Sequence, residues 1–328
     1  MKGFKVVRWF SCIIAALIIL FTGIVSAYAA AINVTANATD TLNGADGQCS
    51  LREAIQNINN GATTYADCVP TGAYGTSDTI NIPAGTYTIA IAGAGEDLNA
   101  TGDFDITKSV TITGAGAGST TINGGALDRV FHITGAYTVS ISGVTIQNGS
   151  PASNGGGIHN NSGTLTVTNS TIVRNTATTG GGIYKLAGAT GFTNSIVADN
   201  GVGLDCVGTI TDSGGNIDSD GNCGTFTQNA AMVQGTGFSA LASNGGPTQT
   251  HALLAGSAAI DTAPTCAGLT TDQRGTTRPQ GSACDIGAYE YVVAAAAVSV
   301  PTMTEWGMII FIFLAGLGAM YYMRRRRA

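Results

Sequence analysis

Six charged residues are spaced so that they could support general acid–base chemistry. Asp103 and Asp105 lie two positions apart, so they would share one side of a strand. Carboxylates clustered beside an arginine are what proton transfer to or from a polysaccharide requires. None of the six lies in a recognised catalytic motif, so we expect solvated turn residues and assign no catalytic residue. The six are Asp103, Asp105, Asp128, Arg129, Arg174 and Asp199.

The three histidines, His132, His159 and His251, fall in different repeats or modules of the chain. A Gly-x-Ser-x-Gly motif does not accompany them, so the sequence does not favour a Ser/His/Asp site. His159 occupies the same place in its repeat as Tyr184 in the next one, which indicates a structural position.

One short segment could bind calcium through oxygen ligands. Asp218, Asp220 and Asn222 alternate as at the start of a calcium loop. However, Gly221 stands at the fourth position instead of the sixth, and no terminal Glu follows at the expected distance. A turn held by Cys223 is the alternative, and we predict no cofactor with certainty beyond this weak calcium candidate.

The cysteines indicate disulfides. Cys12 lies in the predicted signal peptide, which leaves six cysteines in three close pairs. An even number in an exported chain points to disulfides, and six cysteines allow fifteen connectivities. We choose the nearest neighbours: Cys49–Cys68, Cys206–Cys223 and Cys266–Cys284.

The middle of the chain repeats itself. The segment 155–177 is echoed by 180–201, with Gly-Gly-Gly-Ile and Thr-Asn-Ser recurring after 25 residues. Short alternating runs such as Leu165/Val167, separated by Gly or Asn, predict strands with one face buried. A period in the twenties predicts a solenoid. We therefore expect an all-β, right-handed parallel β-helix, with a β-sandwich as the alternative. Asn148, Asn175 and Asn200 close equivalent stretches, where Asn tolerates left-handed turns and can stack in ladders.

A solenoid needs its ends covered, and CSLREAIQNIN supplies a short capping helix. Ser50 and Glu53 have capping-box spacing, and Asn60-Gly61 would end the helix. Arg52 and Glu53 are expected on a solvated face. The apolar stripe consists of Leu51, Ala54, Ile55 and Ile58.

Both ends of the chain are apolar. Basic residues precede the run 12–25, and a small-x-small motif predicts signal-peptide cleavage at Ala29 and Ala30. Residues 307–323 carry no charge and would form a transmembrane helix. Four arginines follow it, and such clusters stay cytoplasmic. These are Arg324, Arg325, Arg326 and Arg327.

Composition excludes one class of partner. The chain has a net charge of −6, and without the two ends seven basic and 19 acidic residues leave −12. Such a surface repels phosphate backbones, so nucleic-acid binding is not expected. Abundant β-branched residues with few charges favour an all-β fold.

Three parts of the chain resemble known bacterial families. The stretch 49–55 resembles the CSLREA motif of β-helix surface proteins, and the GGGI…TNS repeats resemble those of polymorphic outer-membrane-type proteins. The segments NGGPTQTHALLAGSAAID and DQRGTTRPQGSACDIGAYE resemble the choice-of-anchor Q module. The C-terminus resembles the IPTL-type sorting signal, which implies an exosortase-like enzyme as partner. The sorting residues are Val300, Pro301, Thr302, Met303, Glu305, Trp306 and Gly307, followed by the arginine cluster.

These patterns predict five segments: a signal peptide (1–30), a β-helix with an N-terminal cap (31–229), a closing module (230–291), a linker (292–299) and a sorting signal (300–328). In the closing module, Asp272, Arg274, Arg278 and Asp285 would lock a loop onto the last coil. We expect a cell-surface or secreted protein that passes through an inner-membrane-anchored form. Its expected role is non-enzymatic, in adhesion, matrix or envelope structure, with a polysaccharide or matrix ligand. The alternative is a carbohydrate-active lyase or hydrolase on the same fold.

Overall fold

The computed structural model describes residues 29–116, 119–233, 235–245, 249–266, 270–272, 274–287, 289–293 and 303–327. The predicted signal peptide up to residue 28 and the sorting residues 300–302 lie outside these ranges. Contacts group the described residues into one unit ending at Tyr291 and a second beginning at Val292.

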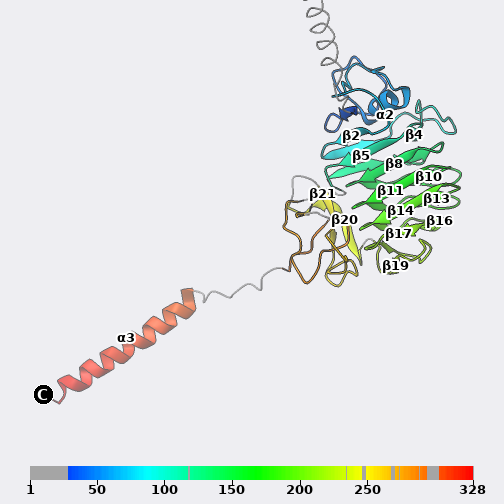
Figure 1. The fold of residues 1–328 in the computed structure, drawn as a ribbon. Helices are drawn as coiled ribbons and strands as arrows, with labels where there is room; N and C mark the ends of the chain where they lie inside the picture. Colours follow the sequence, from blue (N-terminus) through cyan, green and yellow to red (C-terminus); the bar gives the residue numbers. More distant parts are fainter. Residues whose placement is uncertain are drawn as a thin grey trace, which may run out of the picture. The chain divides into compact units, whose positions relative to one another are not determined.

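The first unit consists mainly of three stacked parallel sheets (Figure 1). The first contains β1 (Ala31–Asn33), β2 (Asp78–Ile82), β5 (Val110–Gly114), β8 (Thr138–Ser142), β11 (Thr164–Thr168), β14 (Ala189–Thr193) and β17 (Thr211–Asp212). The second contains β4 (Phe104–Ile106), β7 (Phe131–Ile133), β10 (Ile158–Asn160), β13 (Ile183–Lys185) and β16 (Cys206–Val207). The third contains β3 (Gly85–Thr88), β6 (Thr120–Asn123), β9 (Thr145–Gln147), β12 (Thr171–Val173), β15 (Ile196–Ala198), β18 (Ile217–Asp218) and β19 (Thr227–Gln228).

Successive strands along the chain belong to different sheets. For example, β7, β8 and β9 lie in the second, first and third sheet, and β10, β11 and β12 repeat this order. Each coil therefore adds one strand to every sheet, which is compatible with a parallel β-helix. The strand pairings within these three sheets are all parallel, so a sandwich of antiparallel sheets is wrong for this unit.

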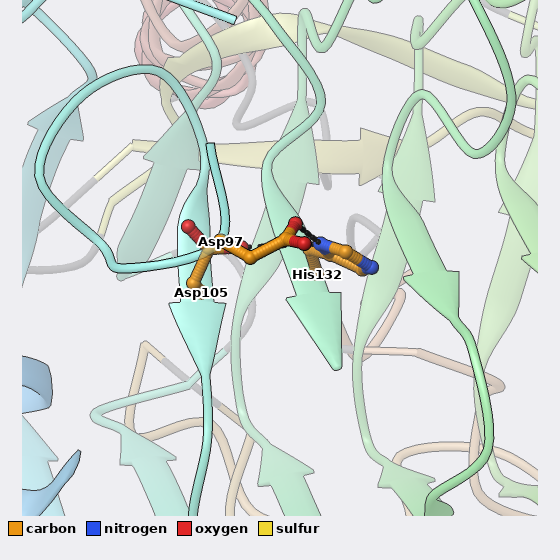
Figure 2. Close-up of side chains that lie close together, drawn as sticks. All are labelled: Asp97, Asp105 and His132. Atoms are coloured by element: carbon orange, nitrogen blue, oxygen red, sulfur yellow. Dashed lines mark hydrogen bonds and ion pairs between the residues drawn. The ribbon is translucent and has the colours of Figure 1, made fainter. Parts of the chain in front are cut away.

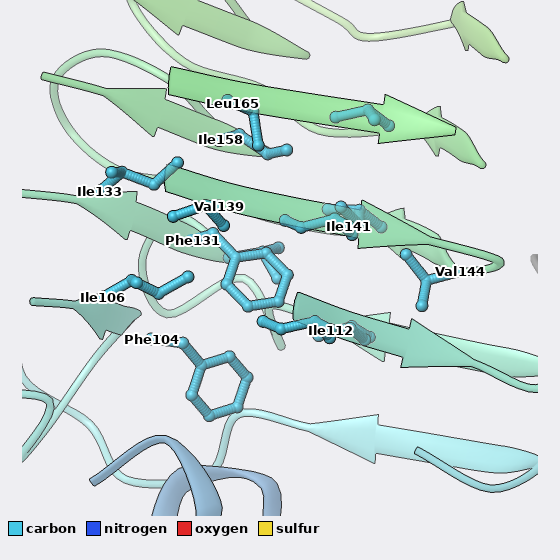
Figure 3. Close-up of a cluster of buried hydrophobic side chains, with 14 of the residues drawn as sticks. Phe104, Ile106, Ile112, Phe131, Ile133, Val139, Ile141, Val144, Ile158 and Leu165 are labelled. Carbon is cyan, nitrogen blue, oxygen red and sulfur yellow. The ribbon is translucent and has the colours of Figure 1, made fainter. Parts of the chain in front are cut away.

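The 25-residue period is the register of the stack. Ile158 pairs with Ile183, and Ile172 pairs with Val197. Alternation turns one apolar row inward from each sheet, and these rows form a continuous core between the sheets (Figure 3). The row from the first sheet includes Ile112, Ile141 and Val167, which are all completely buried.

The N-terminal cap is helix α2 (Leu51–Asn60), as the sequence predicts. The Ser50 hydroxyl accepts from Glu53 N at 3.1 Å, and Ser50 N donates to Glu53 Oε2 at 3.0 Å. Gly61 ends the helix in the left-handed conformation at φ 62°. The predicted apolar stripe is buried in the core.

The expectation that Arg52 lies on a solvated face is wrong. Its side chain is fully buried, and Glu53 is also 0 % exposed. The Arg52 guanidinium binds Asp40 through Nε at 2.7 Å and Nη2 at 3.2 Å. It also donates to the carbonyl oxygens of Gly102 and Asp103 at 2.6 and 3.1 Å. Because arginine has five donors, one side chain ties the cap helix to two distant segments.

Only one of the three asparagines forms the expected left-handed turn. Asn148 has a φ of 56°, but Arg174 and Asp199 hold this position in the next two coils. Asn175 and Asn200 come one residue later and are buried. Their amides form a ladder, in which Asn175 Nδ2 donates to Asn200 Oδ1 at 3.0 Å and Gly149 N donates to Asn175 Oδ1 at 2.9 Å.

Three disulfides join Cys49 to Cys68, Cys206 to Cys223 and Cys266 to Cys284, the neighbours chosen from the sequence. The last one lies in the segment after the stacked sheets, beside the antiparallel hairpin β20 (Phe238–Ser243) and β21 (Gln249–Leu253). There Arg274 pairs with Asp272 at 2.7 Å, and Arg278 donates to the Asp285 carbonyl oxygen at 2.9 Å. These contacts hold the loop as expected.

The second unit contains helix α3 (Met303–Arg325). Residues Gly307–Arg325 are long and apolar enough to cross a membrane. Arg324 and Arg325 lie in its last turn, and Met303, Glu305, Trp306 and Gly307 of the predicted sorting signal lie at its start.

Candidate functional site

The second sheet carries a row of polar side chains across four coils. Asp105, His132, His159 and Tyr184 are direct neighbours in β4, β7, β10 and β13. In each strand the flanking residue is apolar and points into the core, as Phe104 and Phe131 do (Figure 3). The middle residue must therefore face outward. The alternation of the strands thus produces a polar ladder on the outside of the stack.

The side chains of this ladder contact each other. His132 Nδ1 lies 3.1 Å from Asp105 Oδ1. The His132 and His159 rings stack at 4.9 Å with an interplanar angle of 15°. The Tyr184 ring meets the edge of His159 at 5.2 Å. His132 is buried, whereas His159 and Tyr184 are partly exposed.

Arg129 joins the ladder to two further carboxylates. Its Nε lies 2.6 Å from Asp103 Oδ2 and 3.7 Å from Asp128 Oδ1. Its Nη1 lies 2.8 Å from His159 Nδ1. A guanidinium can only donate, so His159 Nδ1 accepts and the ring proton belongs on Nε2. Burial, followed by the charges of His132 and Arg129, lowers the His159 pKa to about 4, which keeps this ring neutral.

Burial also acts on the acidic residues. It raises the pKa of Asp103 to about 8, together with the nearby Asp105 charge and against the attraction of Arg129. Burial raises the pKa of Asp105 as well, opposed chiefly by its hydrogen bond to His132. The expectation of solvated turn residues is therefore wrong for Asp103, Asp105 and Asp128, each at most 1 % exposed.

A loop before β4 adds an acidic residue from outside. The Glu96 carboxylate accepts from the backbone amides of Leu98, Ala100 and Thr101 at 2.6 to 2.7 Å, which orders the loop. Asp97 then projects over the sheet with its side chain 68 % exposed. Its Oδ1 lies 3.3 Å from His132 Nδ1, on the side where Asp105 also meets the ring (Figure 2).

Two carboxylate oxygens and one imidazole nitrogen therefore converge. The ligand atoms of Asp97, Asp105 and His132 all lie within 4.8 Å of one another. Such a set could hold a divalent cation, and the ladder beyond it could exchange protons. Sequence reasoning missed Asp97 and the ladder as a unit. The available signal was the spacing of 27, 27 and 25 residues between Asp105, His132, His159 and Tyr184, about one coil each.

The other candidates lie apart from this ladder in the structure. Asp218 is buried in β18 and accepts from Cys223 N at 3.0 Å, while Asp220 accepts from Asp205 N at 2.8 Å and Asn222 N at 3.0 Å. The predicted calcium ligands thus hold the backbone of a turn. His251 lies in β21, with Nδ1 2.8 Å from the Ser239 carbonyl oxygen, and burial lowers its pKa.

Arg174 and Asp199 occupy equivalent corners of successive coils, where Arg174 N donates to the Asp199 carbonyl oxygen at 3.0 Å. They lie on the third-sheet side, after β12 and β15. Arg174 borders a shallow pocket of about 330 Å³ together with Asn123, Asn148 and Thr176. These two residues do not add to the cluster around Arg129.

No family model matches the chain, and no match was found among curated proteins or solved structures.

Proposed function

We propose that this chain is an exported cell-surface protein whose body is a right-handed parallel β-helix. Its C-terminal helix would hold it in the inner membrane until an exosortase-like enzyme sorts it to the envelope or releases it. The observation that carries the proposal is a disulfide-bonded body followed by a separate apolar helix that ends in arginines. Disulfides persist in oxidising compartments, and an arginine cluster retains one end of a helix in the cytoplasm.

The role that we propose for the body is adhesive or structural. Asp103, Asp128 and Arg129 are mostly buried and pair with each other, so their charges stabilise neighbouring coils instead of facing a polymer. A repetitive outer surface can contact an extended ligand such as a polysaccharide or a matrix protein through several coils at once.

Cell fractionation with one epitope tag after residue 35 and another after Arg327 tests the sorting. Processing predicts that the first tag reaches the envelope or medium while the second remains in the membrane on a short fragment. Replacing Pro301 and Thr302 by Ala should leave both tags on one membrane-bound chain. Both tags in the cytoplasm of the unaltered strain would refute export. Both tags on one full-length membrane chain would refute processing.

One observation favours an enzyme as the second candidate. Asp103, Asp105 and Asp128 converge with Arg129 and His132, a set of groups that could transfer protons during polysaccharide lysis or hydrolysis. Incubation with acidic polysaccharides, with and without calcium, should then give unsaturated products or new reducing ends. Asp103→Asn should abolish them, whereas Asp46→Asn, which removes an exposed carboxylate elsewhere, should not. Equal product from both variants, or none from the original chain, would reject the enzyme.

A further inference from the structure

We propose that Asp97, Asp105 and His132 bind one divalent transition-metal ion, with zinc as the best fit, at the first-coil end of the polar ladder. The site would join the loop before β4 to the outer face of the second sheet. It does not depend on export or sorting, so its test is separate from that of the proposed function.

The distances between the three groups fit a shared ion. His132 Nδ1 lies 3.1 Å from Asp105 Oδ1 and 3.3 Å from Asp97 Oδ1. Two ligand atoms about 2.1 Å from one zinc ion lie about 3.0 Å apart at a right angle and about 3.4 Å apart at a tetrahedral angle. Both separations fall in this interval, so an ion could be held with little movement of the side chains.

Hydrogen bonding alone does not satisfy this arrangement. A neutral imidazole offers one proton at Nδ1, but two carboxylate oxygens face that nitrogen at hydrogen-bond distance. The ring is more than nine-tenths buried, and its Nε2 has no hydrogen-bond partner among the described residues. The histidine therefore lies in a polar environment that its protein neighbours do not complete.

Local charge also favours a cation. Arg129 is already engaged by Asp103, Asp128 and His159. Asp97 and Asp105 share His132 as their nearest cationic group, and Asp105 is fully buried. Two converging carboxylates at low dielectric repel each other, and a dication removes this repulsion.

Outer contacts hold the ligands in place. Asn99 N donates to Asp105 Oδ2 at 2.9 Å, which leaves Oδ1 directed at His132. Asn99 Nδ2 in turn donates to the Arg52 carbonyl oxygen at 3.0 Å, so the cap helix supports the loop. Such outer contacts orient metal ligands and reduce the cost of binding.

The donor set selects among metals. One imidazole and two carboxylates suit Zn²⁺ and, less well, Mn²⁺. Ca²⁺ prefers six to eight oxygen ligands, which three side chains with one nitrogen do not supply. The structure therefore predicts a preference for Zn²⁺ over Mn²⁺ and over Ca²⁺.

The full chain in detergent, stripped with a chelator, would be titrated calorimetrically with each ion and analysed for zinc after dialysis. We expect one zinc per chain. Asp97→Asn, at an exposed position, should weaken zinc binding at least roughly tenfold without unfolding the chain, since even outer-contact losses cost 10–100-fold. Asp46→Asn removes the same charge from another exposed site and should bind zinc as the original chain does.

X-ray absorption of the zinc-loaded chain should show one imidazole among oxygen ligands, and His132→Gln should remove that signal. Circular dichroism would check that this buried variant is folded. The proposal is overturned if zinc fails to bind, if Asp97→Asn binds it unchanged, or if the spectrum lacks imidazole.

Discussion

Arg52 shows how one residue can decide the fit of the cap. Its guanidinium satisfies the Asp40 carboxylate, and Asp40 Oδ2 also accepts from Ala90 N at 2.9 Å. Removing one partner of a buried ion pair leaves an uncompensated charge, so Arg52→Ala should lower the free energy of unfolding by about 3 kcal/mol or more. Urea unfolding followed by circular dichroism measures this loss.

Arg52→Lys is the informative companion, because an ammonium cannot reproduce the two-point contact with Asp40. It should recover only part of the stability. Asn60→Ala, on the exposed end of the same helix, should change stability by less than about 0.5 kcal/mol. A full recovery by lysine would show that charge alone matters there.

Asp285 should make the stability of the closing segment depend on pH. Burial, with smaller effects from Glu290 and Asp261 and against hydrogen bonds from Tyr291 N and Asp261 N, raises its pKa to about 6. The folded state then binds a proton more tightly than the unfolded state. The stabilisation is complete below about pH 3.8 and is lost as pH rises through 6, by on the order of 2 kcal/mol.

Asp285→Asn should remove this part of the pH dependence while leaving the rest of the profile. Urea midpoints at pH 4, 5, 6 and 7 for both chains provide the comparison. Arg278 and Glu290 lie nearby and are retained in both, so they cancel in the difference. An identical slope in the two chains would contradict the assignment.

At the scale of the elements, the inward rows should carry most of the stability of the stack. Phe131 is fully buried, and its ring lies 5.7 Å from that of Phe104 in the neighbouring strand. Phe131→Ala should cost about 3–5 kcal/mol, because the cavity cannot close between fixed coils. Thr166→Ala, on the exposed face of β11, is the control and should be nearly neutral. Comparable losses in both would contradict an inward apolar row.

The sequence predicted those elements whose signals are local. Alternation defined the inward row, the 25-residue echo defined the register, and Ser50, Glu53 and Gly61 defined the cap helix. The direction of Arg52 was missed, because its partners lie 12 to 51 residues away in segments without a repeat. Asp97 was missed for the same reason, since a loop fixed by Glu96 places it.

The polar ladder lies between these cases. His159 was matched to Tyr184 from the repeat alone, and the structure confirms that pairing. The step from His132 to His159 is 27 residues, because the earlier coil differs in length. An echo search at fixed period therefore does not align Asp105 and His132 with the rest. Their proximity follows only from strand pairing.

At the scale of the whole molecule, the two units should be separable. Contacts divide the chain between Tyr291 and Val292, and the three disulfides all precede this point. A chain ending at Tyr291 should therefore keep its disulfides and its urea midpoint within about 0.5 kcal/mol of the full chain. It should also stay in solution without detergent, because the removed helix exposes an apolar surface along its length. Sedimentation without detergent and circular dichroism test both parts. A large loss of stability on truncation would mean that the C-terminal segment completes the fold of the body, whereas an unchanged body would leave anchoring as the work of α3.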